Sequence, residues 1–461
     1  MISASDSSDS SATNIRYQVL AWLCLAAALA YIQRNCVSVA ESTIRGDLEL
    51  TKEQMGWILS GFFWSYASFQ VPAGWLGDRW GSRLTLPLYS SVWSGTTALS
   101  ALAGTFVTVW LVQVFDLGSP VWFAWLWLLA FRLTAGVAQA GLFPCAAVIL
   151  SRWGPSTWLG TGGGLLGASM QVGAIVAALL TGILLEKGLS WQMVFLLFSI
   201  PGSLWAIFFY RWFRDSPSDH AKVNAEELAL IANPGVKKEE LKEEKAVTTN
   251  SRAPWLKLVT SPPMWCICGQ QFCRAAGYIF FASWFPTFLQ ESRGISLAES
   301  GILTAIPLLA ALLGAPLGGI ISDRIYSATG SVDIARRGMA VVCMIVATLL
   351  MVAACLILNP HGAVIMMAAG AFCLSLAGPL VYSVTIEMGG RSVATAFGIM
   401  NMSGNLGAAA FPAVVPFLLG PSQEDWGPVL VVFCFLFAVA SLFWLLLKPH
   451  GTFEGQSLLR D

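Results

Sequence analysis

Long apolar runs separated by short polar segments follow one another along the chain. An α-helix needs about 20 predominantly apolar residues to cross a hydrocarbon layer about 30 Å thick. About twelve runs reach that length, at 17–41, 55–77, 85–112, 121–150, 159–186, 190–212, 263–290, 299–322, 336–358, 362–386, 393–419 and 427–447. The pattern predicts an all-α polytopic membrane protein with twelve transmembrane helices. The predicted bounds are least defined around 104–126, where the sequence is unusually aromatic.

One long polar segment, at 213–262, divides this pattern into two halves, 17–212 and 263–447, each with six predicted helices. The segment contains a run of acidic and basic residues at 237–245, which is typical of a solvated linker. Residues 1–16 and 448–461 are predicted to be tails. The first tail is rich in Ser and Asp and lacks a basic region, so we expect it to be disordered and not a cleaved signal.

Composition agrees with this class and excludes a soluble globular protein. Hydrophobic residues make up 56% of the chain, charged residues 11%, and the mean hydropathy is +0.68, whereas soluble domains are about 25% charged. The ten Cys show no paired ligand spacing and the three His fall in predicted loops. We therefore expect no metal site, no cofactor and no disulfide framework. No nucleophile–base pair is evident, so we expect no enzymatic activity.

Lys and Arg are distributed unequally between the two sides of the predicted helices. If the N-terminus lies inside, most basic loop residues lie on the cytoplasmic side, and the other side keeps Arg45, Lys52, Lys187 and Arg293. Cytoplasmic loops carry the excess of Lys and Arg in membrane proteins. We therefore expect an integral, multi-pass protein of the plasma (inner) membrane with both termini in the cytoplasm.

Three arginines, Arg34, Arg132 and Arg274, lie inside predicted membrane helices, and no Asp or Glu lies near a predicted midplane. An unpaired guanidinium in hydrocarbon costs at least a few kcal/mol, which an anionic ligand reduces. Guanidinium also matches carboxylate or phosphate with two parallel hydrogen bonds. The sequence therefore predicts an anionic substrate.

Arg34 shares a helix face with Tyr31 and Ser38, because these residues follow at i, i+3 and i+7. We expect this face to line a wet cavity. The alternative is that Arg34 extends to the headgroups from a helix end that lies nearer than predicted.

A short motif occurs once in each half. The first copy, GWLGDRWGSR at 74–83, follows the second predicted helix, and the second copy, GGIISDR at 318–324, follows the eighth. Arginines present only to orient the helices would explain the charges but not the repeat. The spacing of glycine, Asp-Arg, glycine and arginine resembles the signature of the major facilitator superfamily.

The charged residues of this motif predict a contact that holds one conformation and releases in another. Asp78 can lie against the positive N-terminus of a helix, and Arg79 and Arg83 can contact carboxylates or carbonyls. Asp323 and Arg324 are the corresponding residues of the second copy.

Further motifs resemble the anion:cation symporter family of that superfamily, which contains bacterial hexuronate and galactonate carriers and animal vesicular glutamate and sialic acid transporters. The resemblance covers nearly the whole chain. It rests on Tyr31, Arg34 and Ser38-Val39-Ala40, on 62–66 and 70–74, on Phe131-Arg132 with Phe143-Pro144, on Tyr278 and Trp284, and on Phe397-Gly398-Ile399-Met400-Asn401 with Gly404-Asn405.

The resemblance implies the major facilitator fold, with two pseudo-symmetric six-helix bundles. It further implies secondary active or facilitative transport of an organic anion by alternating access. Among anions, it favours a sugar acid or another carboxylate over a phosphate. We expect a monomer whose partners are the lipid bilayer, a small anionic substrate and a coupling ion or counter-anion, without nucleic acid.

Arg34 and Arg274, one from each half, are predicted to clamp the anion near the midplane. The other predicted substrate-binding residues are Tyr31, Tyr66, Tyr278, Asn401 and Asn405. Arg132 is assigned to coupling or to the scaffold, and its alternative role is to bind backbone carbonyls of neighbouring helices.

Two glutamines bear on coupling. Sugar-acid symporters of the family carry acidic residues at the positions of Gln33 and Gln139. Glutamine cannot bind and release a proton in the physiological range. A uniporter, an anion exchanger and a sodium-coupled carrier therefore stay open, and so does a membrane nutrient sensor that uses the same scaffold without transporting.

Overall fold

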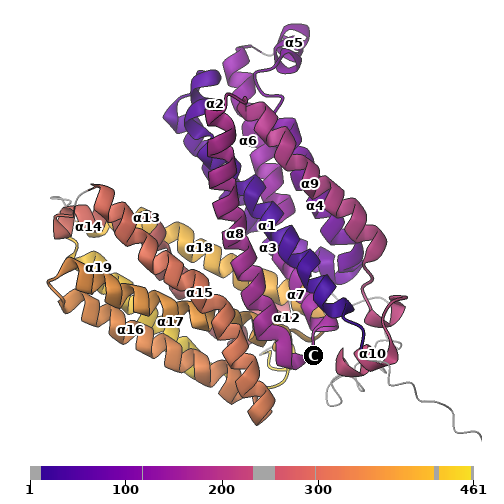
Figure 1. The fold of residues 1–461 in the computed structure, drawn as a ribbon, viewed down its shortest axis with the longest axis vertical. Coiled ribbons are helices and arrows are strands. Elements are labelled where there is room, and N and C mark those ends of the chain that lie inside the picture. The colour runs from indigo at the N-terminus through magenta and orange to yellow at the C-terminus, as the bar shows by residue number, and fades with distance from the viewer. Residues whose placement is uncertain (1–11, 117, 232–254, 296, 420–424, 458–461) are drawn as a thin grey trace, which may run out of the picture.

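The computed structural model describes residues 12–116, 118–231, 255–295, 297–419 and 425–457. In this part of the chain, twelve long helical segments form two bundles of six (Figure 1). The first bundle contains α1 (Ile15–Val39), α3 (Lys52–Trp80), α4 (Ser82–Ser100), α6 (Pro120–Gln139) continued by α7 (Leu142–Trp153), α8 (Leu159–Glu186) and α9 (Trp191–Trp212). The second bundle contains α13 (Pro262–Ser283), α15 (Leu297–Thr329), α16 (Met339–Leu356), α17 (Pro360–Gly389), α18 (Val393–Leu418) and α19 (Gly427–Leu446). The predicted fold class is confirmed.

Short elements connect these helices or extend them. They are α2 (Glu41–Asp47), α5 (Phe106–Phe115), η1 (Ser156–Trp158), η2 (Pro217–Asp219), α10 (Ala225–Ile231), α12 (Trp255–Val259), α14 (Phe285–Arg293), the π-helical turn η3 (Asp333–Gly338) and η4 (Gly390–Ser392).

Most of the long helices are apolar enough to cross a membrane. Eight stretches of the described residues meet this condition, and one of them, Pro360–Phe411, contains both α17 and most of α18. The other long helices, α3, α4 and α13, are less apolar because they bury polar side chains inside the protein. In α4, for example, Ser90 is buried and donates a hydrogen bond to the carbonyl of Gly202 at 3.1 Å. The protein is thus an integral, multi-pass membrane protein.

The two bundles repeat one pattern of helix pairing. In the first bundle α1 packs on α8, α3 on α6 and α4 on α9. In the second bundle the equivalent pairs form, α13 with α18, α15 with α17 and α16 with α19. The bundles meet through α3 against α18 and through α8 against α15, which are again equivalent pairs. The two halves of the sequence therefore have the pseudo-symmetry expected of internal repeats.

Glycines bring the two bundles into backbone contact at one end. A Cβ on Gly74 of α3 would lie 2.4 Å from the carbonyl oxygen of Ala394 in α18. A Cβ on Gly319 of α15 would lie 2.1 Å from the carbonyl oxygen of Gly160 in α8. These contacts lie at the end where α10 and α12 are found, which we call the linker end. The bundles diverge toward the opposite end (Figure 1).

Replacing Gly74 and Gly319 by Ala in one variant is expected to separate the bundles at the linker end. Overpacking of this kind costs about 1–3 kcal/mol, so the population with a closed linker end should fall about tenfold or more. Distances between spin labels placed across this end would lengthen. A Gly95→Ala, Gly182→Ala variant is the matched control, since an added Cβ at either site meets nothing within 4 Å. Unchanged distances in the first variant would contradict the role of these glycines.

The predicted third helix at 85–112 is wrong. α4 ends at Ser100, and α5 forms a separate helix after a turn. Gly104 lies in this turn with φ +73°, and a Cβ there would lie 2.2 Å from Leu48 Cδ2. The chain turns here because only glycine fits, while the apolar run itself continues across the turn.

The described parts of the predicted linker, 213–262, pack on both bundles, because α12 contacts α13 and α18 of the second bundle and α10 contacts α1 of the first. Glu227 of α10 is fully buried and accepts hydrogen bonds from the backbone N–H groups of Ile15 at 3.1 Å and Arg16 at 2.9 Å. It thereby satisfies free donors at the N-terminus of α1. The charged run at 237–245, residues 1–11 of the first predicted tail and residues 458–461 of the second lie outside the described residues.

Candidate functional site

Arg34 of α1 lies inside the first bundle with only 7% of its surface exposed. Three aromatic rings enclose its guanidinium carbon, with ring centres at 4.4 Å (Tyr31), 4.5 Å (Tyr66) and 4.7 Å (Phe62). Cation–π contacts stabilise the charge by about 0.5–2 kcal/mol each, but they use none of its hydrogen-bond donors. The Nη2 group of Arg34 is buried and has no hydrogen-bond partner in the part of the chain that the structure describes. Arg34 therefore offers a charged donor to a ligand.

Gln139 and Arg132 lie beside Arg34. Arg34 Nε donates to Gln139 Oε1 at 3.1 Å, and Gln139 Nε2 donates to the carbonyl of Ala30 at 3.2 Å. Arg132 Nη2 donates to the carbonyl of Arg34 at 3.4 Å, while its Nε is buried without a partner. No ion pair of Arg34 or Arg132 occurs within the described residues. Two guanidinium groups thus share one buried region that lacks a carboxylate.

Gln33 points away from this region, toward α4 and α9. Its Nε2 donates to Ser94 Oγ at 3.2 Å and to the carbonyl of Phe198 at 2.9 Å. Its Oε1 accepts from Thr97 Oγ1 at 3.2 Å. The side chain of Gln33 therefore joins three helices and makes no hydrogen bond to that of Arg34 within the described residues.

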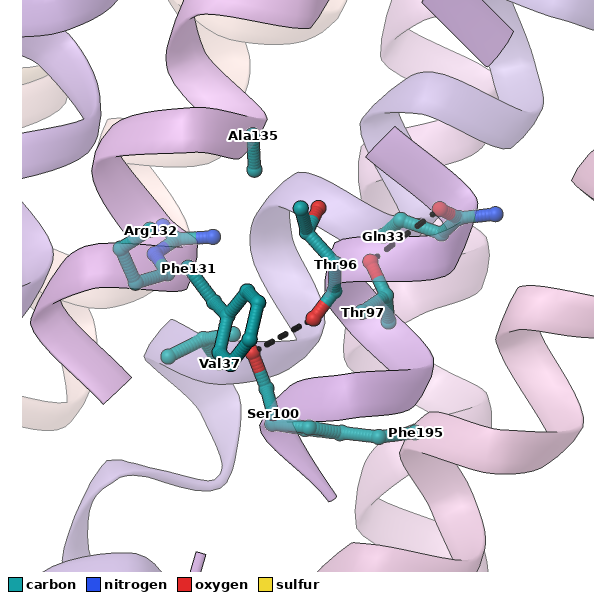
Figure 2. Close-up of a pocket in the computed structure, with 9 residues that line it drawn as sticks. All are labelled: Gln33, Val37, Thr96, Thr97, Ser100, Phe131, Arg132, Ala135 and Phe195. Carbon is teal, nitrogen blue, oxygen red and sulfur yellow. Dashed lines mark hydrogen bonds between the residues drawn. The ribbon is translucent and has the colours of Figure 1, made fainter. Parts of the chain in front are cut away.

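A small cavity separates Gln33 from Arg132 in the first bundle (Figure 2). Thr96, Thr97 and Ser100 of α4 line it with hydroxyl groups. Two of these hydroxyls bond to other residues of the lining: Ser100 Oγ donates to the carbonyl of Thr96 at 2.8 Å, and Thr97 Oγ1 donates to Gln33 Oε1 at 3.2 Å. Phe131 and Phe195 form apolar parts of the wall. The cavity lies within one bundle, so it differs in position from the contact between the bundles.

Residues of the second bundle reach the aromatic enclosure through α18. Asn401 Nδ2 donates to Gln70 Oε1 at 2.8 Å and to Tyr66 Oη at 3.5 Å. Gln70, which was not among the predicted site residues, is fully buried, and its Nε2 has no hydrogen-bond partner within the described residues. Asn405 donates to the carbonyl of Asn401 at 2.8 Å, so its amide nitrogen bonds within its own helix.

Arg274 lies in the second bundle on α13. Its Nε and Nη2 donate to Gln271 Oε1 at 3.3 Å and 3.1 Å. Tyr278, one turn later, and Tyr382 of α17 both interact electrostatically with Arg274. Tyr382, which sequence reasoning missed, lies near Arg274 and near Tyr31 and Tyr66 of the first bundle, and its ring centre lies 5.0 Å from that of Phe397 in α18.

Asp78 and Asp323 occupy equivalent positions at the linker end. Asp78 accepts hydrogen bonds from the backbone N–H of Ala394 at 3.0 Å and from the N–H and hydroxyl of Thr395 at 2.9 Å and 2.7 Å. Asp323 accepts from the N–H of Gly160 at 3.1 Å and from the N–H and hydroxyl of Thr161 at 2.6 Å and 2.7 Å. Each carboxylate thus caps the N-terminus of a helix of the other bundle, α18 or α8.

The arginines of the two motifs have different surroundings. Arg79 is exposed and lies over the ring of Trp75, with 5.3 Å between guanidinium carbon and ring centre. Arg83 Nε donates to the carbonyl of Tyr210 at 3.4 Å, within its own bundle. Arg324 is exposed. None of these three makes a described contact between the bundles.

A different arginine, Arg336, pairs with Asp323. It is fully buried, and its Nη1 donates to Asp323 Oδ1 and to Ser322 Oγ, both at 2.7 Å. Its Nε donates to Glu387 at 3.4 Å. Arg336 is the first residue of the predicted helix 336–358, where the sequence predicted no partner for it, and the π-helical turn η3 carries its side chain into the bundle.

Comparison with known proteins identifies related transporters. A "probable sulfoacetate transporter" (SauU) of Cupriavidus necator is 27% identical over 404 residues, which is 88% of this chain and 87% of that protein. A "probable galactarate/D-glucarate transporter" (GudP) of Bacillus subtilis is 27% identical over 95% of this chain and 93% of its own length. The hexuronate transporter of Bacillus subtilis is also 27% identical, over 94% and 96%. These relatives are transporters and not enzymes.

Solved structures show the same fold. The proton:xylose symporter XylE, bound to 6-bromo-6-deoxy-D-glucose, matches 95% of this chain and 98% of its own with a TM-score of 0.68 at 14% identity. FucP in its outward conformation matches 93% and 98% with a TM-score of 0.65 at 15% identity. The family model described as "Major Facilitator Superfamily" matches residues 23–412 and 267–458. The chain therefore belongs to the major facilitator superfamily.

Proposed function

We propose that the protein transports a small organic anion, a sugar acid or another carboxylate, by alternating access, with Arg34 as the first anion contact. The observation that carries this proposal is the buried Nη2 of Arg34, which has a charge, an aromatic enclosure and no partner. A carboxylate at this nitrogen would satisfy the donor and offset the buried charge. A sensor would not need the paired helix caps at Asp78 and Asp323.

The named substrates of the relatives support the choice of ligand. Sulfoacetate, galactarate, glucarate and hexuronate each carry at least one carboxylate, and all except sulfoacetate also carry several hydroxyls. Tyr31 and Tyr66 supply rings and hydroxyls beside Arg34 that suit such molecules, and Tyr382 lies near both tyrosines. We infer that a polyhydroxylated acid with one or two carboxylates fits this site.

Arg274 is proposed as the contact in the second half. Gln271 holds its Nε and Nη2, which leaves Nη1 toward Gly378 of α17, where an added Cβ would lie 4.0 Å away. A ligand held by Arg34 and Arg274 would connect the two bundles. Binding would then favour the conformation in which both arginines reach it, which is the coupling that alternating access requires.

We further propose that the linker end faces the cytoplasm, so that both tails and the linker at 213–262 lie there. The excess of Lys and Arg in the short loops of that side supports this orientation. In this orientation the contacts of Asp78 and Asp323 close the path to the cytoplasm. Release of both helix caps would be the step that opens it.

Gln139→Glu is expected to make uptake depend on an imposed pH gradient, whereas wild-type uptake responds weakly. The new carboxylate would lie beside Arg34 Nε, where Gln139 Oε1 now lies at 3.1 Å. An anionic substrate on Arg34 would weaken the positive field there, so the carboxyl would bind a proton more readily with substrate bound. Uptake of labelled galactarate or glucuronate into proteoliposomes, under pH, sodium or counter-anion gradients, measures this dependence.

Gln33→Asp is the matched control for that variant. The side chain of Gln33 bonds to Ser94, Thr97 and the carbonyl of Phe198, whereas Arg34 Nε bonds to Gln139, so a carboxylate at Gln33 should acquire much less substrate-linked protonation. Strong substrate-dependent proton movement in the wild type would contradict the proposal and direct attention to Glu387. Equal pH responses of the two variants would contradict the different roles of the two glutamines.

A further inference from the structure

The short helix α5 takes no part in the proposed transport site. It lies at the rim of the first bundle, at the end opposite the linker end (Figure 1). One side of the helix, with Thr108 and Val112, is buried against the protein. The opposite side is exposed and follows a helical spacing of i, i+1, i+4, i+7 and i+8. It consists of Phe106, Val107, Trp110, Gln113 and Val114.

This exposed face is too apolar for a helix that faces water. Phe106 is 82% exposed, Val114 54% and Trp110 48%. No charged residue occurs between 84 and 115, so the surrounding chain does not compensate with charge. An apolar face of this kind marks contact with a membrane or with another protein.

The neighbouring surface is aromatic in the same way. Trp122 at the start of α6 is 51% exposed, and its ring centre lies 4.6 Å from that of Trp125. Trp57, near the corresponding end of α3, is 61% exposed. Tryptophan concentrates where a membrane protein passes from hydrocarbon to headgroups. Exposed aromatic side chains of α3, α5 and α6 therefore occur at the same end of the first bundle.

We propose that α5 is an interfacial helix that binds phospholipid at the membrane surface opposite the linker end, with Phe106, Trp110 and Val114 inserted below the headgroups. Glycines at both ends permit the helix to lie across the ends of the membrane helices, because Gly104 and Gly118 have φ values of +73° and +82°. Amphipathic helices bind in this way by burying an apolar face at the boundary of headgroups and acyl chains.

A second copy of the chain fits this face less well. The helix has ten residues and is therefore about 15 Å long. One side of it offers far less than the roughly 800 Å² per partner that stable protein–protein interfaces bury. A bilayer imposes no such minimum, since the surrounding membrane helices already anchor the protein.

Photocrosslinking from α5 tests this proposal on the full chain in liposomes. We would place p-benzoyl-phenylalanine at Phe106 or at Val114, and include phosphatidylcholine that carries an alkyne on one acyl chain. Leu313, 62% exposed on the long helix α15, is the positive control. Ser218, exposed in η2 outside the membrane helices, is the negative control. Both α5 positions are expected to yield lipid adducts within about twofold of Leu313 and at least tenfold above Ser218.

A Trp110→Glu variant supplies the second measurement. It should lower the lipid adduct at Val114 about tenfold or more while the protein keeps its melting temperature, because the charge removes the face from the membrane without touching the buried side. Covalent dimers at Phe106 in place of lipid adducts would overturn the proposal in favour of a second copy. Adducts no stronger than those of Ser218 would overturn it in favour of a solvated helix.

Discussion

Arg34→Lys is expected to weaken binding of the organic anion about 30-fold or more while the protein still folds. Lysine keeps the positive charge inside the enclosure of Tyr31, Tyr66 and Phe62, but it loses the planar fork that holds a carboxylate with two hydrogen bonds. A hydrogen bond to a charged group contributes about 1.5–3 kcal/mol, and about 2 kcal/mol corresponds to this factor. Calorimetric titration of the purified protein with galactarate or glucuronate would measure it.

Arg79→Lys is the matched control for that substitution. Arg79 is exposed over Trp75 at the linker end, far along α3 from the enclosure. The affinity of the Arg79→Lys variant for the same acids should equal that of the wild type. Unchanged affinity in Arg34→Lys, with the protein folded, would show that Arg34 does not hold the anion.

Asp78→Asn is expected to shift the protein about tenfold toward the conformation with an open linker end. Asp78 accepts three hydrogen bonds at the N-terminus of α18, two from backbone N–H groups and one from the Thr395 hydroxyl. Asparagine keeps one acceptor oxygen and loses the charge that the helix N-terminus favours, which together cost about 1–2 kcal/mol. The cost falls only on the closed state, so the equilibrium moves toward the open one.

Spin labels on unnatural amino acids at Arg211 and Arg324 would report this shift, because these exposed positions lie in different bundles at the linker end. The distance distribution should gain a longer component in Asp78→Asn and keep the wild-type form in Asp219→Asn, whose carboxylate is exposed in the linker. Identical distributions in all three proteins would mean that the cap does not control closure.

The architecture was predictable because each membrane helix is a long apolar run and because the two halves repeat. The same reasoning failed at 85–112, where an apolar run contains a turn at Gly104, whose φ of +73° favours glycine. A run of apolar residues indicates that a segment is buried in the protein or faces lipid. It does not indicate whether the segment crosses the membrane or lies on its surface.

Directions of side chains were the part that sequence could not supply. Gln33 and Gln139 are both amides close to arginines in the sequence or on a predicted helix face. Gln33, however, forms hydrogen bonds to α4 and α9, whereas Gln139 forms one to Arg34. Arg336 lies at the end of a predicted helix with no partner apparent in the sequence, although it is buried between Asp323 and Glu387. Each depends on how a helix is rotated against its neighbours, and that rotation is decided by packing between segments distant in the sequence.

Counterflow of an acidic sugar into proteoliposomes tests most directly whether the protein carries organic anions by alternating access. Vesicles preloaded with unlabelled galactarate would be diluted into labelled galactarate, with no ion gradient imposed, so that the outcome does not depend on the coupling ion. We expect transient accumulation of label that galactarate or glucuronate competes away, that neutral galactitol leaves unchanged, and that Arg34→Lys strongly reduces at the same galactarate concentration. Absence of counterflow for galactarate, glucuronate and sulfoacetate alike, or equal competition by galactitol, would contradict anion transport through Arg34.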